Sequence, residues 1–237
     1  MSDRLARCRL YLCTGERPDL VEFVAACVRG GVDVVQLREK HLDDRALLDR
    51  AQRLQALCAG AGVPFIVNDR PDLAARAGAD GVHLGQTDPA PSLARELLGP
   101  DAVIGRSTHA VADLERALTE PVDYLSAGPV VPTPTKPGRA GTGTGYLSTA
   151  VERSALPVFV TGAVAPHNVG PLVAAGARHF VAVRWLTESS DPEGAARALR
   201  TAIEECLRAA RPGGGAGERS EGARGGHGAG GEEGAAR

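Results

Sequence analysis

Three polar side chains alternate along one short apolar segment of the sequence. Residues 34–40 read VVQLREK, which has the composition of a β-strand that ends in charged residues. Side chains alternate between the two faces of a strand, so Gln36, Arg38 and Lys40 share one face and the apolar residues share the other. An amide, a guanidinium and an ammonium on an inward face require a counter-charge. The segment predicts an anionic ligand; a solvated strand end is the alternative.

Two carboxylates follow the next two apolar segments. Residues 65–70 read FIVNDR and residues 81–88 read GVHLGQTD, so Asp69 and Asp88 end two neighbouring predicted strands. Mg²⁺ commonly binds one or two carboxylates together with substrate phosphates. Acidic groups beside a cationic cluster therefore predict a magnesium site. The alternative is that each aspartate caps the helix that follows it, because a proline stands close behind each one.

Later segments add further polar groups. Ser107 can donate a hydrogen bond to a phosphate or a ring nitrogen, or it can cap a helix. Residues 128–138 read GPVVPTPTKPG, a loop whose hydroxyls and Lys136 suit an anion and whose glycine-rich continuation could close over substrate. A plain connector is the alternative. His83 and His109 lack neighbours at metal-ligand spacing and are expected to pack around the site.

Lysine is scarce in this chain, which makes its positions informative. Of the 27 Lys and Arg residues only Lys40 and Lys136 are lysine, and asparagine occurs only at Asn68 and Asn168. Arginine and lysine differ in shape and hydration, so a lysine kept in such a composition is expected to be needed for its own geometry. Both lysines lie in the segments already singled out.

The elements that must position these residues alternate between two patterns over residues 1–210. Strands are expected at 10–13, 32–37, 64–68, 81–84, 102–104, 124–127, 157–161 and 180–183, with helices between them such as 19–28, 44–59 and 191–208. Eight such units in one domain predict an α/β fold, the (β/α)8 TIM barrel, which typically has about 250 residues. An open doubly wound sheet is the alternative. Barrel active sites lie at the C-terminal ends of the strands, where the candidate residues stand.

The last two strands supply a second region for an anion. They end in Thr161-Gly162-Ala163 and Val183-Arg184, at the corner where barrels often bind a phosphate through backbone N–H groups. With the cationic and acidic cluster of the earlier strands, this makes two anionic regions. The pair suggests a reaction that joins a diphosphate to a monophosphate.

Composition limits the remaining choices. Residues 211–237 hold 11 glycines and no large apolar side chain, so this tail is expected to be disordered. The net charge of −2 argues against a nucleic-acid partner, and no apolar run approaches the roughly 20 residues of a membrane span. The first residues, MSDRLARC, lack the apolar core of a signal peptide. Five cysteines without C-x-x-C spacing are expected to be reduced, mostly buried thiols in the cytoplasm.

The motifs resemble those of the thiamine-phosphate synthase family, in family order and over about residues 9–205. The matching segments are Gln36-Leu37-Arg38-Glu39-Lys40, Asn68-Asp69-Arg70, residues 81–86 with Asp88, Ile104-Gly105-Arg106-Ser107, and Gly128-Pro129 through Thr133-Pro134-Thr135-Lys136. The resemblance implies that hydroxymethylpyrimidine diphosphate and a thiazole phosphate, or its carboxylated form, are joined to thiamine monophosphate with release of pyrophosphate. It implies a dissociative substitution assisted by Mg²⁺, without a protein nucleophile.

The resemblance also implies a role for each matched position. The pyrimidine diphosphate would be held by Gln36, Leu37, Arg38, Glu39, Lys40, Asn68, Ser107 and Lys136, of which Arg38, Lys40, Ser107 and Lys136 would be catalytic. Asp69 and Asp88 would hold Mg²⁺. The thiazole phosphate would be held by Thr133, Pro134, Thr135, Gly162, Ala163, Val183 and Arg184.

Two positions depart from the family pattern. The family usually carries a second glycine where this chain has Ala163 and a serine where it has Arg184. Backbone donation at Ala163 is expected to survive if its φ is negative, and Arg184 could replace the serine as a phosphate partner. The alternatives are a thiazole tautomerase with the same barrel and a non-catalytic protein that binds thiamine intermediates. A homo-oligomer is left open.

Overall fold

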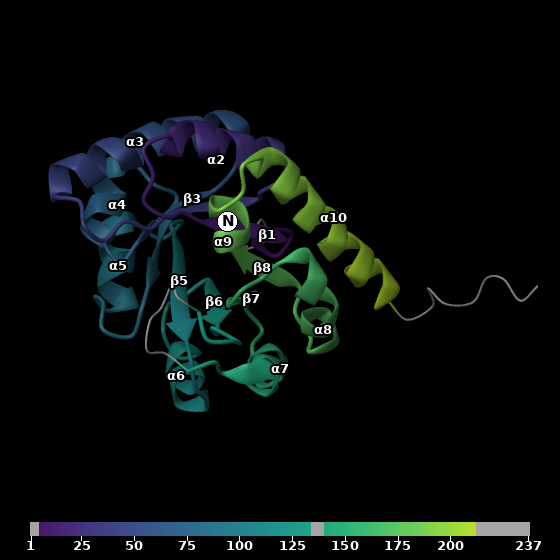
Figure 1. Ribbon diagram of the computed structural model, residues 1–237. Coiled ribbons are helices and arrows are strands. Elements are labelled where there is room, and N and C mark those ends of the chain that lie inside the picture. Colours follow the sequence, from purple (N-terminus) through teal and green to yellow (C-terminus); the bar gives the residue numbers. More distant parts are fainter. Residues whose placement is uncertain (1–4, 134–139, 212–237) are drawn as a thin grey trace, which may run out of the picture.

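The protein is a closed barrel of eight parallel strands surrounded by helices (Figure 1). The computed structural model describes residues 5–133 and 140–211. Each strand pairs with the next, and β8 pairs with β1, which closes the barrel and rules out the open sheet. The strands are β1 (Leu10–Cys13), β2 (Val34–Leu37), β3 (Phe65–Asn68), β4 (Gly81–Leu84), β5 (Val103–Thr108), β6 (Tyr124–Ala127), β7 (Val158–Val160) and β8 (His179–Ala182).

Helices follow the strands and form the outer layer. They are α2 (Leu20–Arg29), α3 (Asp44–Ala61), α4 (Pro71–Ala77), α5 (Pro91–Leu98), α6 (Val111–Ala117), α7 (Gly143–Arg153), the 3-10 turn η1 (Pro166–Asn168), α8 (Val169–Ala174), α9 (Arg184–Thr187) and α10 (Pro192–Ala209). The predicted TIM barrel is therefore confirmed, with all eight expected strands present. No helix among the described residues combines the length and the apolar composition needed to cross a bilayer.

The largest difference from the predicted strands is at β5, which was expected to end at residue 104. It continues to Thr108 because its backbone pairs with β6 through Ser107↔Ser126 and Thr108↔Ala127. The polar residues of this stretch are therefore part of the strand, and backbone pairing with β6 keeps them there. This extension carries Ser107 into the barrel interior.

Apolar packing occurs in two layers. The larger layer fills the space between strands and helices, and includes Leu37, Val67, Leu84 and Leu125. The smaller layer lies inside the barrel and consists of Leu5, Cys8, Tyr11, Val34, Ile66, Val103, Tyr124 and Phe159. Leu5 and Cys8 precede β1, so the segment before the first strand contributes to the apolar packing inside the barrel.

Carboxylates organise the end of the barrel where the strands begin. The aspartate before each of β2, β4 and β6 accepts a hydrogen bond from the backbone at the start of the preceding strand. The bonds run from Leu10 N to Asp33 (3.0 Å), from Phe65 N to Asp80 (2.9 Å) and from Ile104 N to Asp123 (2.8 Å). Each bond ties the residue before one strand to the first or second residue of the neighbouring strand, which helps to fix their register. In barrels, side chains at this end support stability.

His179 gives this end of the barrel a pH dependence. Its Nδ1 lies 2.6 Å from the carbonyl oxygen of Cys8, which can only accept, and burial lowers the pKa of its imidazole. The unfolded chain, with a His pKa of about 6.5, therefore binds a proton before the folded protein does as the pH falls. Stability should drop on going from about pH 7 to about pH 5.

Replacing this histidine isolates its contribution. We expect the free energy of unfolding to fall more steeply with acidification in the wild type than in His179→Gln, by at most about 1.4 kcal/mol per pH unit. Urea unfolding of both proteins at the two pH values measures the difference. Equal losses in the two proteins would contradict the assignment.

Candidate active site

A large cavity opens at the C-terminal ends of the strands and gathers most of the predicted site residues. Its volume is about 620 Å³, within the range of small-molecule sites. The predicted residues that line it are Gln36, Arg38, Lys40, Asn68, Asp69, Asp88, Ser107, Thr133, Gly162, Ala163, Val183 and Arg184. Pro134, Thr135 and Lys136 lie outside the described residues, as does the tail from residue 212 on, so what was expected of them stays a prediction.

The alternation along β2 decides which of its side chains reach the cavity. Gln36, Arg38 and Lys40 line it, as expected. Leu37 points the other way and packs in the outer apolar layer. The Glu39 carboxylate is fully buried against Arg50 of α3, with 2.5 Å between Oε1 and Nη1. The side chains of Leu37 and Glu39 therefore share the outward face, and the substrate contacts that the resemblance implies for these two residues stay a prediction.

Asp69 and Asp88 lie together in this cavity with a cation beside them. Lys40 Nζ is 3.1 Å from Asp69 Oδ2. Burial, and next the hydrogen bond with the Asp69 carboxyl, raise the pKa of Asp88. Two acidic groups in hydrogen-bonding contact beside one ammonium form a compact acidic pair. No cluster of three or more Asp, Glu, His or Cys residues that could hold a metal ion occurs among residues 5–133 and 140–211.

The helix-cap alternative for these aspartates is wrong. The residue at the N-terminal boundary of α4 is Arg70 and that of α5 is Ala90, and neither helix has a side-chain cap. Asp88 instead accepts from the backbone N–H of Gly85 at 2.6 Å, within its own turn. Asp69 has φ of 63°, a left-handed conformation that is uncommon for residues with a side chain. Such local strain concentrates at functional sites.

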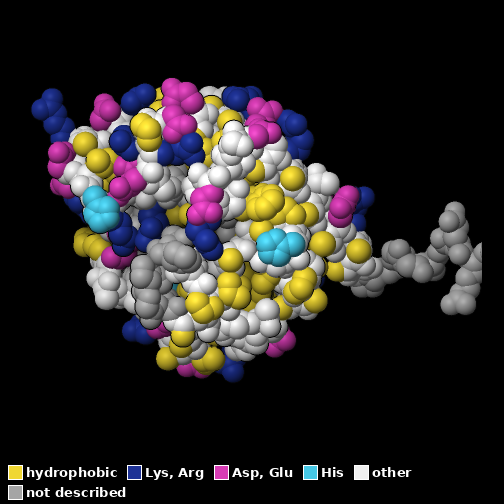
Figure 2. Space-filling view, viewed as in Figure 1, with side chains coloured by type: hydrophobic (Ala, Val, Ile, Leu, Met, Phe, Trp, Pro, Cys, Tyr) yellow, Lys and Arg dark blue, Asp and Glu magenta, His cyan; other side chains and the backbone are white. Residues whose placement is uncertain are grey.

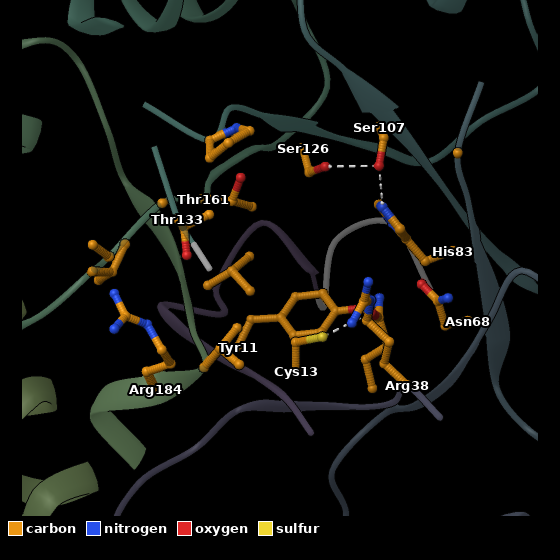
Figure 3. A pocket seen from close by; sticks show the side chains of 18 of the residues that line it. Tyr11, Cys13, Arg38, Asn68, His83, Ser107, Ser126, Thr133, Thr161 and Arg184 are labelled. Carbon is orange, nitrogen blue, oxygen red and sulfur yellow. Dashed lines mark hydrogen bonds between the residues drawn. The ribbon is translucent and has the colours of Figure 1, made fainter. Parts of the chain in front are cut away.

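The floor of the cavity is a network of hydrogen-bonded side chains that the sequence analysis did not identify. We call it the floor network; its members in bonding order are Cys13, Gln36, Tyr11, Tyr124, His83, Ser107 and Ser126. Figure 3 shows Ser126, Ser107 and His83 joined at one side of the cavity. His83 thus packs beneath the cavity, in contact with Tyr124 and Ser107. The missed signal was period two: Tyr11 and Cys13, like Gln36 and Arg38, are alternate residues of a strand.

The opposite side of the cavity is formed by the loops after β6, β7 and β8. Figure 3 shows Arg184, Thr133 and Thr161 lying together there, across the cavity from Arg38 and Asn68. The surface around the cavity also differs from side to side. In Figure 2, charged side chains crowd the region of α3 and α4, whereas hydrophobic ones spread around α8. The cavity therefore has two distinct halves.

The turn after β7 has an unusual backbone. Gly162 has φ of 113°, and a Cβ there would lie 2.6 Å from the backbone nitrogen of Val130. Ala163 has φ of 52°, so the negative φ on which survival of its backbone donation was made conditional is not present. Alanine occupies a left-handed position that favours glycine.

This strain predicts opposite effects for two single substitutions. Ala163→Gly should raise the free energy of unfolding by up to about 1 kcal/mol, because it relieves the left-handed alanine. Gly162→Ala should lower the free energy of unfolding, because its methyl group would meet the Val130 backbone. Denaturant unfolding of both variants provides the measurement. A destabilised Ala163→Gly protein would contradict the strained conformation.

Comparisons with known proteins agree with this geometry. The family model described as thiamine monophosphate synthase matches residues 10–186. A thiamine-phosphate synthase of Thermosynechococcus vestitus is 44% identical over 196 residues, 83% of this chain and 56% of the relative. One of Thermus thermophilus is 47% identical over 198 residues, 81% of this chain and 95% of the relative. The chain thus spans little more than half of the first relative and nearly all of the second.

A solved structure extends the similarity to three dimensions. The thiamine phosphate pyrophosphorylase of Pyrococcus furiosus superposes with a TM-score of 0.79 at 29% identity, covering 87% of this chain and 98% of that one. The family match runs from the start of β1 into α9 and includes all the lining residues of the cavity except Glu188. The resemblance of the sequence motifs is thereby confirmed, and the chain belongs to the thiamine monophosphate synthase family.

Proposed function

We propose that this protein is a thiamine-phosphate synthase, which joins hydroxymethylpyrimidine diphosphate to a thiazole phosphate and releases pyrophosphate. The observation that carries the proposal is the two-sided cavity. One half holds Arg38 and Lys40 next to two carboxylates, and the other half holds Arg184 beside threonine hydroxyls. A diphosphate suits the first half and a monophosphate suits the second.

The proposed reaction is a substitution at the methylene carbon of the pyrimidine. The carbon–oxygen bond breaks and its electron pair leaves with pyrophosphate; the thiazole nitrogen then donates its lone pair to form the carbon–nitrogen bond. The aminopyrimidine ring stabilises the cation formed between the two events. The protein must neutralise the departing charge and hold the thiazole nitrogen close to the carbon. Arg38 and Lys40 serve the first task, together with Lys136 by resemblance, and the Arg184 half serves the second.

The acidic pair fits a magnesium ion. Asp69 and Asp88 bring two carboxylates into contact. Lys40 supplies one positive charge beside them, so a further cation would balance the second carboxylate. Mg²⁺ is usually bound by one or two carboxylates and completes its shell with water and substrate phosphates. We therefore propose that Asp69 and Asp88 hold Mg²⁺, which when bound neutralises charge on the diphosphate.

The cysteines fit the cytoplasmic location that we propose for this enzyme. Burial of Cys27 and Cys58 raises the pKa of each thiol to about 12, which suits the reduced state.

The decisive experiment supplies both substrates and measures pyrophosphate and thiamine phosphate, with and without Mg²⁺. We expect both products to form, and a chelator to suppress them. Isomerisation of the thiazole substrate alone would instead identify a tautomerase. Binding of either substrate without turnover would identify a non-catalytic protein, and both results would refute the proposal.

Asp88→Asn tests the magnesium role. Asparagine keeps an oxygen that can accept from Gly85 N–H but loses the charge, so the fold should persist. We expect kcat/KM to fall about 100-fold or more, and the Mg²⁺ concentration for half-maximal activity to rise. Asp101→Asn, at an exposed turn away from the cavity, is the matched control and should behave as wild type. An unchanged Mg²⁺ dependence in Asp88→Asn would exclude this carboxylate as a ligand.

Arg184→Ala tests the second half of the cavity. Loss of a charge-assisted hydrogen bond to phosphate, worth about 1.5–3 kcal/mol, should raise KM for the thiazole phosphate about 10-fold to 100-fold. KM for the pyrimidine diphosphate should stay unchanged, because Arg184 lies across the cavity from Arg38. Steady-state kinetics with each substrate varied in turn measures the two values. Arg197→Ala, on the exposed face of α10, serves as the control. Equal rises in both KM values would argue against a separate phosphate half.

A further inference from the structure

The floor network joins five strands of the barrel beneath the cavity. Its contacts run from Cys13 Sγ to Gln36 Oε1 (3.1 Å), from Gln36 Nε2 to Tyr11 Oη (2.9 Å), between Tyr11 and Tyr124 Oη (2.9 Å), between Tyr124 Oη and His83 Nδ1 (2.9 Å), between His83 Nε2 and Ser107 Oγ (2.9 Å), and from Ser126 Oγ to Ser107 Oγ (3.4 Å). The side chains come from β1, β2, β4, β5 and β6. All of these residues are buried, so water competes little for these bonds.

The amide of Gln36 determines in which direction the bonds run. Its oxygen accepts from the Cys13 thiol, and its nitrogen donates to Tyr11 Oη. A tyrosine hydroxyl carries one proton, and Tyr11, which already accepts from Gln36, can give that proton to Tyr124 across their 2.9 Å contact. Tyr124, which accepts from Tyr11, in turn has its proton for the next member. The sense of donation therefore passes from Gln36 toward the histidine.

The direction of hydrogen-bond donation selects one tautomer of His83. With donation in this sense, Nδ1 of His83 would accept the proton of Tyr124 across their 2.9 Å contact, which would leave Nδ1 without hydrogen and place the imidazole hydrogen on Nε2. Nε2 then donates to Ser107 Oγ. Burial raises the pKa of both Tyr11 and Tyr124, so neither hydroxyl loses its proton at neutral pH and the sense is kept.

Ser107 receives two hydrogen bonds on its oxygen, from His83 Nε2 and from Ser126 Oγ. Its own single proton is then directed elsewhere. Ser107 lines the cavity, so a bound molecule lies within its reach. A hydroxyl held in this way can donate to a substrate and cannot accept from it.

We propose that the floor network holds His83 as its Nε2–H tautomer and thereby makes Ser107 an obligatory hydrogen-bond donor to the bound pyrimidine substrate. Its partner is an acceptor atom, either an unprotonated ring nitrogen or a phosphate oxygen. Tyr11, Tyr124 and His83 are positioning residues that act through Ser107. The identity of the substrate rests on the proposed function, but the tautomer does not.

The tautomer can be measured directly in the full-length protein without substrate. Two-bond ¹H–¹⁵N correlation spectra of protein labelled with ¹⁵N-histidine distinguish the two neutral tautomers. The signals of His83, one of six histidines, are those missing in His83→Asn. We expect the Nε2–H pattern at neutral pH. An Nδ1–H pattern, or protons on both nitrogens, would overturn the proposal.

Tyr124→Phe tests whether the network positions the site. The ring keeps its packing against Phe159, and only the hydroxyl is lost. We expect the His83 spectrum to move toward a mixture of tautomers and kcat to fall about 10-fold to 100-fold, as when the hydrogen-bonding partner that orients a functional histidine is removed. KM for the thiazole phosphate should not change. Tyr146→Phe, on α7 outside the network, is the matched control and should leave the spectrum and kcat unchanged.

The outcomes separate this inference from the proposed function. A Nε2–H pattern in a protein that makes no thiamine phosphate supports the network and refutes only the proposed function. An active enzyme with the Nδ1–H pattern, or one in which Tyr124→Phe alters neither spectrum nor kcat, overturns the network. Circular dichroism of each variant confirms that it is folded before these readings are compared.

Discussion

Closure of the parallel sheet is the constraint on which the rest of the structure depends. Because β8 pairs with β1, all eight strands end at one rim, and residues far apart in the sequence face a shared space. Lys40 follows β2 and Asp69 follows β3, yet their side chains meet at 3.1 Å. The pairing of β2 with β3 brings these two residues together, and closure adds Arg184, after β8, to the cavity that Arg38 lines. The topology of the strands therefore determines which residues meet at the site.

The two rims of the barrel divide stability and chemistry between them. At the rim where strands begin, Asp33, Asp80 and Asp123 are committed to backbone N–H groups of the barrel itself. At the rim where strands end, Arg38 and Arg184 line an open cavity. Carboxylates at one end bind the backbone of the barrel, whereas polar groups at the other end line the cavity. This division explains how a site with strained backbone at Asp69 and Ala163 is tolerated.

Part of the site could be predicted from the sequence, because the alternation of side chains between the two faces of a strand is a local property. This alternation correctly placed Gln36, Arg38 and Lys40 in the cavity. Leu37 and Glu39 were included only because they lie inside a matched motif, and the same alternation turns their side chains outward. Tyr11 and Tyr124 were missed because a tyrosine in an apolar strand is usually core, and only tertiary packing brings their hydroxyls together. The backbone angles of Asp69 and Ala163 likewise depend on the surrounding turns and have no local signal.

The aspartate bonds at the strand starts recur with a period of two strands. They link β1 to β2, β3 to β4 and β5 to β6, so these six strands fall into three similarly built pairs. In the last pair, Arg178 stands before β8 where the others carry aspartate, and it donates instead to carbonyls of its own segment. A pair of strands with its helices, about a quarter of the barrel, is therefore the repeating module of this architecture. Exchanges of segments between related barrels should be best tolerated when their junctions fall between modules, where no such side-chain tie is cut.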